Sequence, residues 1–264
     1  MLRGLYTAGA GMVTETLRTD TISNNLANVN TTGYKKDVAV SEEFEPLLLR
    51  RINDASASRD VTSFKNFSVS SQAPVVGKLG RGSLISELAT SHEQGPFQNT
   101  GSSLDVAING RGYFVVNTPQ GQRYTRNGNF SRSVTGQLVN SDGQAVLGTN
   151  NRPITLPESG EVKIGSDGTL YDGQDAIGQL QVVDFADRRA LLKQGSSLFY
   201  SQPGARPQAA TGTVEQGMLE RSNVNVVSEM VALITNYRAY EADSKALMTQ
   251  DSLLDKAVNE VGRV

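Results

Sequence analysis

Residues 226–261 read VVSEMVALITNYRAYEADSKALMTQDSLLDKAVNEV, and this stretch decides the architecture of the chain. Its apolar residues recur in alternating steps of four and three, which is the spacing of one face of an α-helix. We expect a helix that starts after a cap at Asn223 or Asn225. Its stripe consists of Val226, Met230, Leu233, Tyr237, Tyr240, Leu247, Leu254, Val258 and Val261, interrupted by Ser244 and Asp251.

A matching pattern lies at the other end of the chain. The same steps join Leu5, Ala8, Met12, Glu15, Thr19, Ile22, Leu26 and Val29. Residues 28–33 (NVNTTG) suit a helix end followed by a left-handed turn. Burying one large apolar side chain stabilises a protein by roughly 1.5–3 kcal/mol. We therefore expect another protein surface to bury these two long apolar stripes.

Two interpretations of these helices remain open. One is an ordinary bundle packed on the core of its own domain. The spacing favours the other, in which helix packs on helix, first within the chain and then between copies. On that interpretation the assembly interface consists of Leu5, Met12, Ile22, Leu26, Val29, Val226, Met230, Leu233, Tyr237, Tyr240, Leu247, Leu254 and Val258.

The middle of the chain has a β pattern punctuated by glycine. Asn-Gly and Asp-Gly pairs at 109–110, 127–128, 142–143, 167–168 and 172–173 supply the positive φ angles that tight hairpins require. Short strands are expected at 83–89, 106–108, 113–116, 137–139, 145–147, 154–156, 162–164 and 179–185, with residues 202–207 ending the β pattern. We therefore predict an α+β fold, with the terminal helices packed as a coiled-coil-like layer and a small central barrel or sandwich.

The expected organisation has four parts. They are an N-terminal helix at 1–33, an extended linker or inner segment at 34–100, a β-rich outer domain at 101–210 and a C-terminal helix at 211–264. Within the second part, residues 44–52 could form a short helix or a buried anchor. Residues 53–72 are rich in Ser, Asp and Asn and suggest an extended segment or long loop.

Composition argues against several classes of function. Lys+Arg 25 against Asp+Glu 27 leaves a net charge of −2, which disfavours nucleic-acid binding as the main task. The chain has no Cys and no Trp, and its one histidine, His92, is expected in a solvated loop. Asp142, Asp167 and Asp172 each precede glycine, so turn chemistry accounts for them. We expect no enzyme, no cofactor and no metal, with calcium at 167–175 only a weak possibility.

The first residues do not suggest a signal or an anchor. Residues 1–8 carry a single arginine and no continuous apolar run, and Glu15, Arg18 and Asp20 follow closely. We expect neither a cleaved signal peptide nor insertion in a membrane.

Three segments resemble the bacterial flagellar axial-protein family, which builds the rod and hook. Residues 22–35 (ISNNLANVNTTGYK) are similar to its N-terminal signature. Residues 104–114 (LDVAINGRGYF), continued by YTRNGNF at 124–130 and GQLV at 136–139, resemble the opening of its β domain. Residues 219–227 (LERSNVNVV) and 238–241 (RAYE) resemble its C-terminal signature. Length and this C-terminal signature resemble distal-rod members, whereas residues 42–53 are closer to proximal-rod members.

The resemblance implies a structural rod subunit in the flagellar basal body, in the periplasm and cell-wall space. Such proteins are exported by the flagellar type III apparatus without a cleaved signal. They polymerise into a helical homo-oligomer, contact other rod and hook proteins, and transmit motor torque to the hook. P and L ring proteins are further candidate partners. A wall-associated glycan-binding or glycan-hydrolysing protein with helical oligomerisation ends, and a secreted adhesin, are the alternatives.

Overall fold

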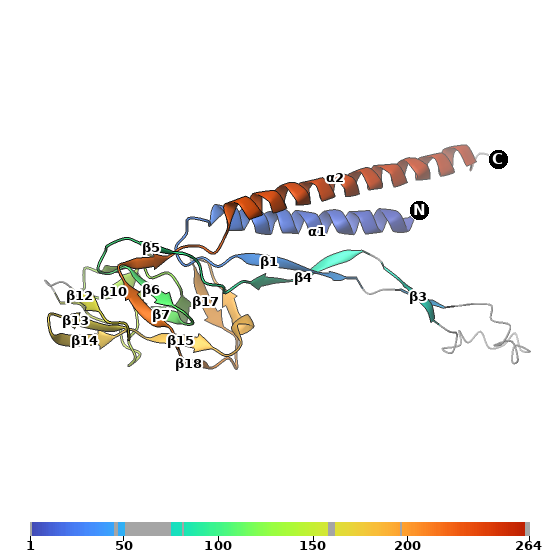
Figure 1. Cartoon of the computed structure of the whole chain (residues 1–264). Coiled ribbons are helices and arrows are strands. Elements are labelled where there is room, and N and C mark those ends of the chain that lie inside the picture. The colour runs from blue at the N-terminus through green and yellow to red at the C-terminus, as the bar shows by residue number, and fades with distance from the viewer. Residues whose placement is uncertain are drawn as a thin grey trace, which may run out of the picture. The chain divides into compact units, whose positions relative to one another are not determined.

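The computed structural model describes residues 2–44, 47–50, 75–80, 82–157, 162–195 and 197–261. It divides into two compact units (Figure 1). Unit 1 comprises Met1–Asp20, Ala39–Leu88 and Leu233–Val264, and unit 2 comprises Thr21–Val38 and Ala89–Ala232. The expected 53–72 segment lies outside the described residues. The fold is α+β, as predicted, with a helix at each end of a β-rich middle.

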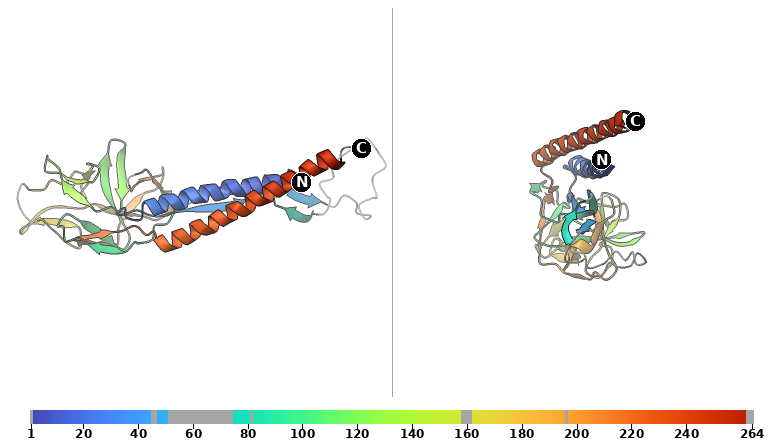
Figure 2. Two further views of the ribbon diagram at one scale, coloured as in Figure 1. Left: turned by 90° about the horizontal axis from the view of Figure 1, so that it is seen from above. Right: turned by 90° about the vertical axis from the view of Figure 1, so that its right-hand side faces the viewer.

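The two long helices are α1, Leu2–Ala27, and α2, Val226–Lys256, which ends in a π-helical turn at Ala257–Val261. Both helices run from one unit into the other. In unit 1, α1 lies between α2 and the strand pair β1 (Asp37–Glu43) and β4 (Ser83–Thr90), as the views in Figures 1 and 2 agree. The predicted strand at 83–89 is thereby confirmed.

A second strand pair in unit 1 corrects one expectation. β2 (Leu47–Arg50) pairs antiparallel with β3 (Val75–Leu79), so the short helix considered for residues 44–52 is wrong where that stretch is described. Three consecutive leucines fit a strand only when a partner supplies hydrogen bonds, and here the partner comes from about 30 residues downstream. Residues 45–46 and 51–52 lie outside the described part.

The helix ends follow the local sequence signals. α1 stops at Ala27, and Gly33 has a φ of +67°, which agrees with the expected left-handed turn. α2 starts directly after Asn225, whose Oδ1 accepts a hydrogen bond of 3.2 Å from the Ser228 amide. Asn225 is therefore the cap. Asn223, the other candidate, instead accepts from the Lys36 amide at 2.8 Å.

Unit 2 is built on a nine-stranded sheet with the order β16-β17-β8-β7-β11-β10-β9, in which β15 pairs with both β7 and β18. Smaller sheets join β12-β13-β14, β19-β6 and β20-β5. Their bounds are β5 Phe97–Asn99, β6 Val106–Asn109, β7 Tyr113–Thr118, β8 Gly121–Thr125, β9 Phe130–Arg132, β10 Leu138–Asn140, β11 Ala145–Val146, β12 Val162–Ile164, β13 Thr169–Asp172, β14 Asp175–Gln179, β15 Val182–Phe185, a 3₁₀ turn η1 Arg188–Ala190, β16 Leu191–Lys193, β17 Leu198–Ser201, β18 Pro207–Ala209, β19 Thr213–Gln216 and β20 Met218–Glu220.

The core of unit 2 lies on both faces of this sheet. Along β7, Phe114 and Val116 point into one buried cluster, and Tyr113 and Val115 into another. Successive side chains of a strand face opposite sides, so a strand buried on both faces is apolar throughout. β7 is therefore the central strand of the unit.

Most expected strands are present, and the exceptions have local causes. Residues 154–156 form one isolated bridge, at Thr155, and Pro153 before them forms another. Pro153 and Pro157 have no amide hydrogen with which to extend a ladder. The stretch 202–207 is followed by three further strands, β18 to β20. Gly110, Gly143, Gly168 and Gly173 have positive φ, as predicted. Gly128 does not, and a Cβ there would lie 1.6 Å from the Val106 carbonyl oxygen.

Candidate assembly surface

In unit 1 one side of α1 is held by the β1–β4 strand pair. Thr14 Oγ1 donates to the Ser83 carbonyl oxygen at 3.0 Å, and Arg18 Nη2 donates to Ser41 Oγ at 2.7 Å. Thr14 is buried, and the Gly82 backbone packs on Ala10 of the same face. Small and polar residues of α1 therefore contribute to this contact.

The contact between α1 and α2 in unit 1 is also polar. Asn236 Nδ2 donates to the Glu15 carbonyl oxygen and to Thr19 Oγ1, both at 2.6 Å. Seven residues further on, Asp243 lies against Gly11, where a Cβ would come within 2.4 Å of Oδ2. After another seven residues, Gln250 lies against Gly4. The two helices are antiparallel, since later residues of α2 meet earlier residues of α1.

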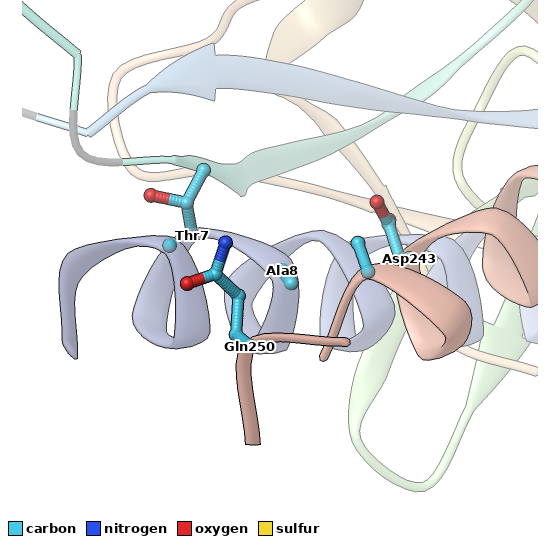
Figure 3. A pocket seen from close by; sticks show the side chains of 6 residues that line it. Thr7, Ala8, Asp243 and Gln250 are labelled. Carbon is cyan, nitrogen blue, oxygen red and sulfur yellow. The ribbon is translucent and has the colours of Figure 1, made fainter. Parts of the chain in front are cut away.

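A groove runs beside this contact. It has a volume of about 500 Å³ and is lined by Gly4, Thr7, Ala8, Asp243, Ala246 and Gln250. Figure 3 shows the Asp243 and Gln250 side chains of α2 next to Thr7 and Ala8 of α1. Because small residues line the α1 side, the helices approach closely there without interlocking large apolar side chains.

The predicted interface residues differ in exposure. Ten are half-buried, namely Leu5, Met12, Ile22, Leu26, Val29, Val226, Leu233, Tyr240, Leu247 and Leu254. Met230, Tyr237 and Val258 are exposed. Ile22, Leu26, Val29, Val226 and Met230 belong to unit 2 and the others to unit 1. On α2 the half-buried positions follow a heptad that also includes Asn236, Asp243 and Gln250.

The sequence analysis missed a second set of apolar residues on the helices. On α1 these are Tyr6, Val13 and Leu17, with exposed fractions of 72, 61 and 47%. On the unit 1 part of α2 they are Ile234, Met248 and Leu253, beside the predicted Tyr237 and Val258. The sequence contained a signal for this second set, because Tyr6, Val13 and Leu17 are spaced by seven and then four residues, as on one face of a helix. Each helix thus has apolar residues on more than one side.

In unit 2 the three segments of the resemblance meet at one buried cluster. Glu220 lies between two cations: Oε1 accepts from Lys35 Nζ at 2.5 Å, and Oε2 accepts from Arg126 Nη1 at 3.0 Å. The side chains of Lys35 and Glu220 are 0% exposed and that of Arg126 is 3% exposed. We call Lys35, Arg126 and Glu220 the buried triad. Buried charges of this kind require partners, and here each finds one.

Backbone groups complete the coordination of the buried triad. Gly95 N donates to Glu220 Oε1 at 2.9 Å, and Gly33 N donates to the Glu220 carbonyl oxygen at 2.8 Å. Lys35 Nζ also donates to the Glu93 carbonyl oxygen at 2.6 Å. Arg126 donates to the carbonyl oxygens of Ile108 and Gly110, while its buried Nε has no hydrogen-bond partner among the described residues. Burial lowers the pKa of Lys35, and the nearby Glu220 opposes that shift.

Beside the triad, the expectation for His92 is wrong. His92 lies in a loop, but its Nδ1 is 2.7 Å from the Tyr113 hydroxyl and its ring packs on Phe199. Burial, followed by the positive charges of Arg188 and Lys35, lowers the pKa of His92 to about 4. The loop contacts the core because Gly95 next to it fits under the Arg221 carbonyl oxygen, where a Cβ would lie within 2.1 Å.

Of the three acids that precede glycine, Asp142 and Asp167 lie in turns, whereas Asp172 is the last residue of β13. Asp167 accepts from the Thr169 hydroxyl at 2.6 Å, and Asp142 lies in the turn between β10 and β11. Across the described ranges, no three His, Cys, Asp or Glu side chains form a group that could hold a metal ion. In the same part of the chain, no helix has the length and apolar character needed to cross a membrane.

Comparison with known proteins gives the family. Residues 5–35 match the model described as "Flagella basal body rod protein", residues 107–171 the "Flagellar hook protein FlgE/F/G D1 domain", and residues 215–260 the "Flagellar basal body rod FlgEFG protein C-terminal". Lys35 lies in the first match, Arg126 in the second and Glu220 in the third. The buried triad thus joins the three segments that match the family.

Relatives match over almost the whole chain. The flagellar basal-body rod proteins FlgG of Borreliella burgdorferi and of Bacillus subtilis are each 35% identical, over 98% of this chain and 98 and 99% of their own length. The basal-body rod protein FlgF of Caulobacter vibrioides is 33% identical over the full length of both chains. No enzymatic activity is indicated for this family, and the wall-associated glycan alternative has no support. The chain therefore belongs to the flagellar rod and hook family and is a structural subunit of the basal-body rod.

Proposed function

We propose that the chain polymerises through its terminal helices into a helical tube that transmits motor torque to the hook. The observation that carries the proposal is the exposed apolar surface of α1 and α2 in unit 1. A helix with apolar residues on several sides is typical of one that is buried all round. In the single chain α1 has α2 on one side and the β1–β4 strand pair on another, and Tyr6, Val13 and Leu17 are still exposed.

The size of this surface supports assembly. Tyr6, Val13, Leu17, Ile234, Tyr237 and Met248 are all more than 45% exposed. Complete burial of one such side chain is worth roughly 1.5–3 kcal/mol, so covering several of them would stabilise an assembly substantially. The predicted interface residues on the half-buried sides of the helices would complete the layer.

The polar contact between α1 and α2 supports the same conclusion. Asn236, Asp243 and Gln250 occupy a heptad position that an apolar residue would fill in a self-sufficient coiled coil. The net contribution of one intramolecular hydrogen bond to stability is only about 0.5–1.5 kcal/mol. We infer that a coiled-coil-like layer forms only when neighbouring copies add their apolar faces to this pair.

The geometry favours an open polymer. The exposed apolar residues lie on two different helices, so a contact between copies can join unlike surfaces. Such heterologous contacts produce a helical filament when the rotation does not close a ring. A layer of packed helices resists twisting, which is the property that a torque-transmitting tube needs.

Family membership supports assembly with other flagellar rod and hook components. Beyond that, we propose the export apparatus as a transient partner, P and L ring proteins as further neighbours, and the periplasm and cell wall as the location. We also propose export without a cleaved signal. The relatives include proteins named FlgG and a protein named FlgF, so we propose a position in either the distal or the proximal rod.

The domain roles follow from the same model. We propose that residues 1–33 and 211–264 serve as axial segments, residues 34–100 as an inner segment and residues 101–210 as the outer β-rich domain. The terminal segments would then make most contacts between copies, whereas the outer domain would tolerate more change at its surface.

The proposal is tested by placing charges on the exposed apolar side of α1. Val13→Asp with Leu17→Asp should stop incorporation into basal bodies of a deletion strain, seen by electron microscopy, and should abolish swimming. The circular dichroism spectrum and the hydrogen exchange of unit 2 should not change. Val134→Asp is the matched control, because Val134 is fully exposed in unit 2.

A second variant addresses the half-buried side. Leu233→Asp with Leu247→Asp should also prevent incorporation. Rods of normal length and number containing either double variant would refute the helical interface. Loss of incorporation with Val134→Asp to the same extent would instead place the essential surface elsewhere.

A further inference from the structure

The buried triad has an arrangement that neither rod membership nor polymerisation explains. Its three residues come from positions 35, 126 and 220, and each lies in a different family match. Charged residues are rarely buried completely unless they are paired, and each buried pair must offset the loss of hydration. This cluster lies entirely within unit 2, so its consequence can be examined in the isolated chain.

Glu220 is the hub of the cluster. Both side-chain oxygens and the carbonyl oxygen accept hydrogen bonds, from Lys35, Arg126, Gly95 and Gly33. Lys35 and Gly33 belong to the segment that follows α1, and Glu220 to the segment that precedes α2. One residue therefore links the two ends of the chain to each other and to the β body.

The charges of the cluster do not balance. Two cations share one carboxylate, so the buried triad has a formal charge of +1. Loss of Lys35 would leave a balanced Arg126–Glu220 pair. Loss of Glu220 would leave two buried cations without an anion, which is strongly destabilising. Of the two cations, Lys35 is the excess one, so the N-terminal segment that contains it depends most on Glu220.

Further contacts between the same segments reinforce this dependence. The Lys36 amide donates to Asn223 Oδ1 at 2.8 Å, and Arg221 Nη2 donates to Asn30 Oδ1 at 3.1 Å. All of them require the C-terminal segment at 220–223 to be in place. The N-terminal segment also bonds to α1, since the Tyr34 hydroxyl donates to Oδ1 of Asn24 at 2.9 Å and of Asn25 at 3.2 Å. Gly33, Lys35 and Lys36 instead bond to residues 220 and 223 of the C-terminal segment.

We propose that Glu220 locks the two chain ends together, so that residues 31–36 become ordered in unit 2 only when residues 218–223 are docked. The lock is a conformational device of the single chain. It does not depend on polymerisation, and it makes order at one end conditional on order at the other.

The test is peptide-resolved hydrogen exchange on the full chain with Glu220→Gln. A glutamine has one acceptor oxygen in place of two, so either Lys35 or Arg126 loses its partner. We expect exchange in residues 31–36 to become at least about tenfold faster, equivalent to about 1.4 kcal/mol. Exchange in residues 218–223 should rise together with it.

Glu215→Gln is the matched control. It makes the same chemical change five residues earlier. Among the described residues, the Glu215 side chain accepts only an exposed hydrogen bond from Asn109 Nδ2, at 2.8 Å. It should leave the exchange of residues 31–36 unchanged. Faster exchange at 218–223 with full protection at 31–36 in Glu220→Gln would overturn the proposal.

A second measurement decides the case in which Glu220→Gln does not fold. Lys35→Met removes the excess cation, so Glu220→Gln should be better tolerated in the Lys35→Met background. The effect on the unfolding equilibrium constant should be at least about tenfold smaller there, or folding should be restored. Lys36→Met, which keeps the backbone bond to Asn223, should give no such rescue. An equal effect of Glu220→Gln in both backgrounds, or continued failure to fold, would refute the lock.

Discussion

Replacement of Gly33 by alanine measures how tightly the end of the N-terminal segment is packed on the β body. Gly33 has a φ of +67°, and a Cβ at this position would lie 2.4 Å from Asn127 N and 2.5 Å from the Arg126 carbonyl carbon. Both atoms belong to the backbone, so no side-chain rotation can relieve the crowding. The chain must shift at Gly33 or at Arg126, a member of the buried triad.

The expected loss has two parts. A residue other than glycine in the left-handed region costs about 1–2 kcal/mol. Overpacking in a tight site adds about 1–3 kcal/mol. The free energy of unfolding of unit 2 should therefore fall by about 2–5 kcal/mol in Gly33→Ala.

Gly143→Ala is the control that separates the two parts. Gly143 has a φ of +77°, and a Cβ there would meet no atom within 4 Å. Only the conformational cost of about 1–2 kcal/mol applies. The assay is chemical denaturation followed by tyrosine fluorescence, since the chain has no tryptophan. Equal losses in the two variants would refute the view that backbone packing at residue 33 joins the N-terminal segment to the β body.

Three further predictions follow from the structure. Burial lowers the pKa of His92 to about 4, so between about pH 4 and pH 6.5 the folded chain binds fewer protons than the unfolded chain, and the free energy of unfolding should fall as pH is lowered through this range. If the free energy of unfolding of His92→Gln depends on pH in the same way, His92 is not the cause. Burial raises the pKa of Tyr34 and of Tyr113 to about 12, so the folded state disfavours tyrosinate and the free energy of unfolding should fall above about pH 10. A single tyrosinate absorbance transition near pH 10, in the folded and the unfolded chain alike, would exclude this effect. Gly9 is helical with open space around it, so Gly9→Ala should slow hydrogen exchange in α1 by stabilising it by about 0.5–1 kcal/mol, and faster exchange would disprove this.

Features governed by neighbours in sequence were predictable. The helix spans, the Asn225 cap and the turn glycines at 110, 143, 168 and 173 all depend on interactions within a few residues. Such interactions are encoded in spacing and residue type. Strands at 106–108 and 113–116 were also predicted, because a doubly buried strand is apolar along its whole length.

Features that depend on distant partners were not predictable in the same way. β2 has the composition of a helix or an anchor and becomes a strand only through β3. His92 looks like a solvated loop residue and is half-buried against Tyr113 and Phe199. The role of Asn236, Asp243 and Gln250 was not predicted, because it depends on α1: Asn236 bonds to two residues of α1, and the other two lie against its glycines.

By itself, the sequence determined the two helical ends, the β-rich middle and the family, since each rests on local pattern or on motifs. Only the tertiary structure decided which residues of those motifs act together. Lys35, Arg126 and Glu220 are each unremarkable as single charged residues, which are usually exposed. Folding removes all three from water at one point, and the loss of hydration makes each depend on partners about 90 or more residues away.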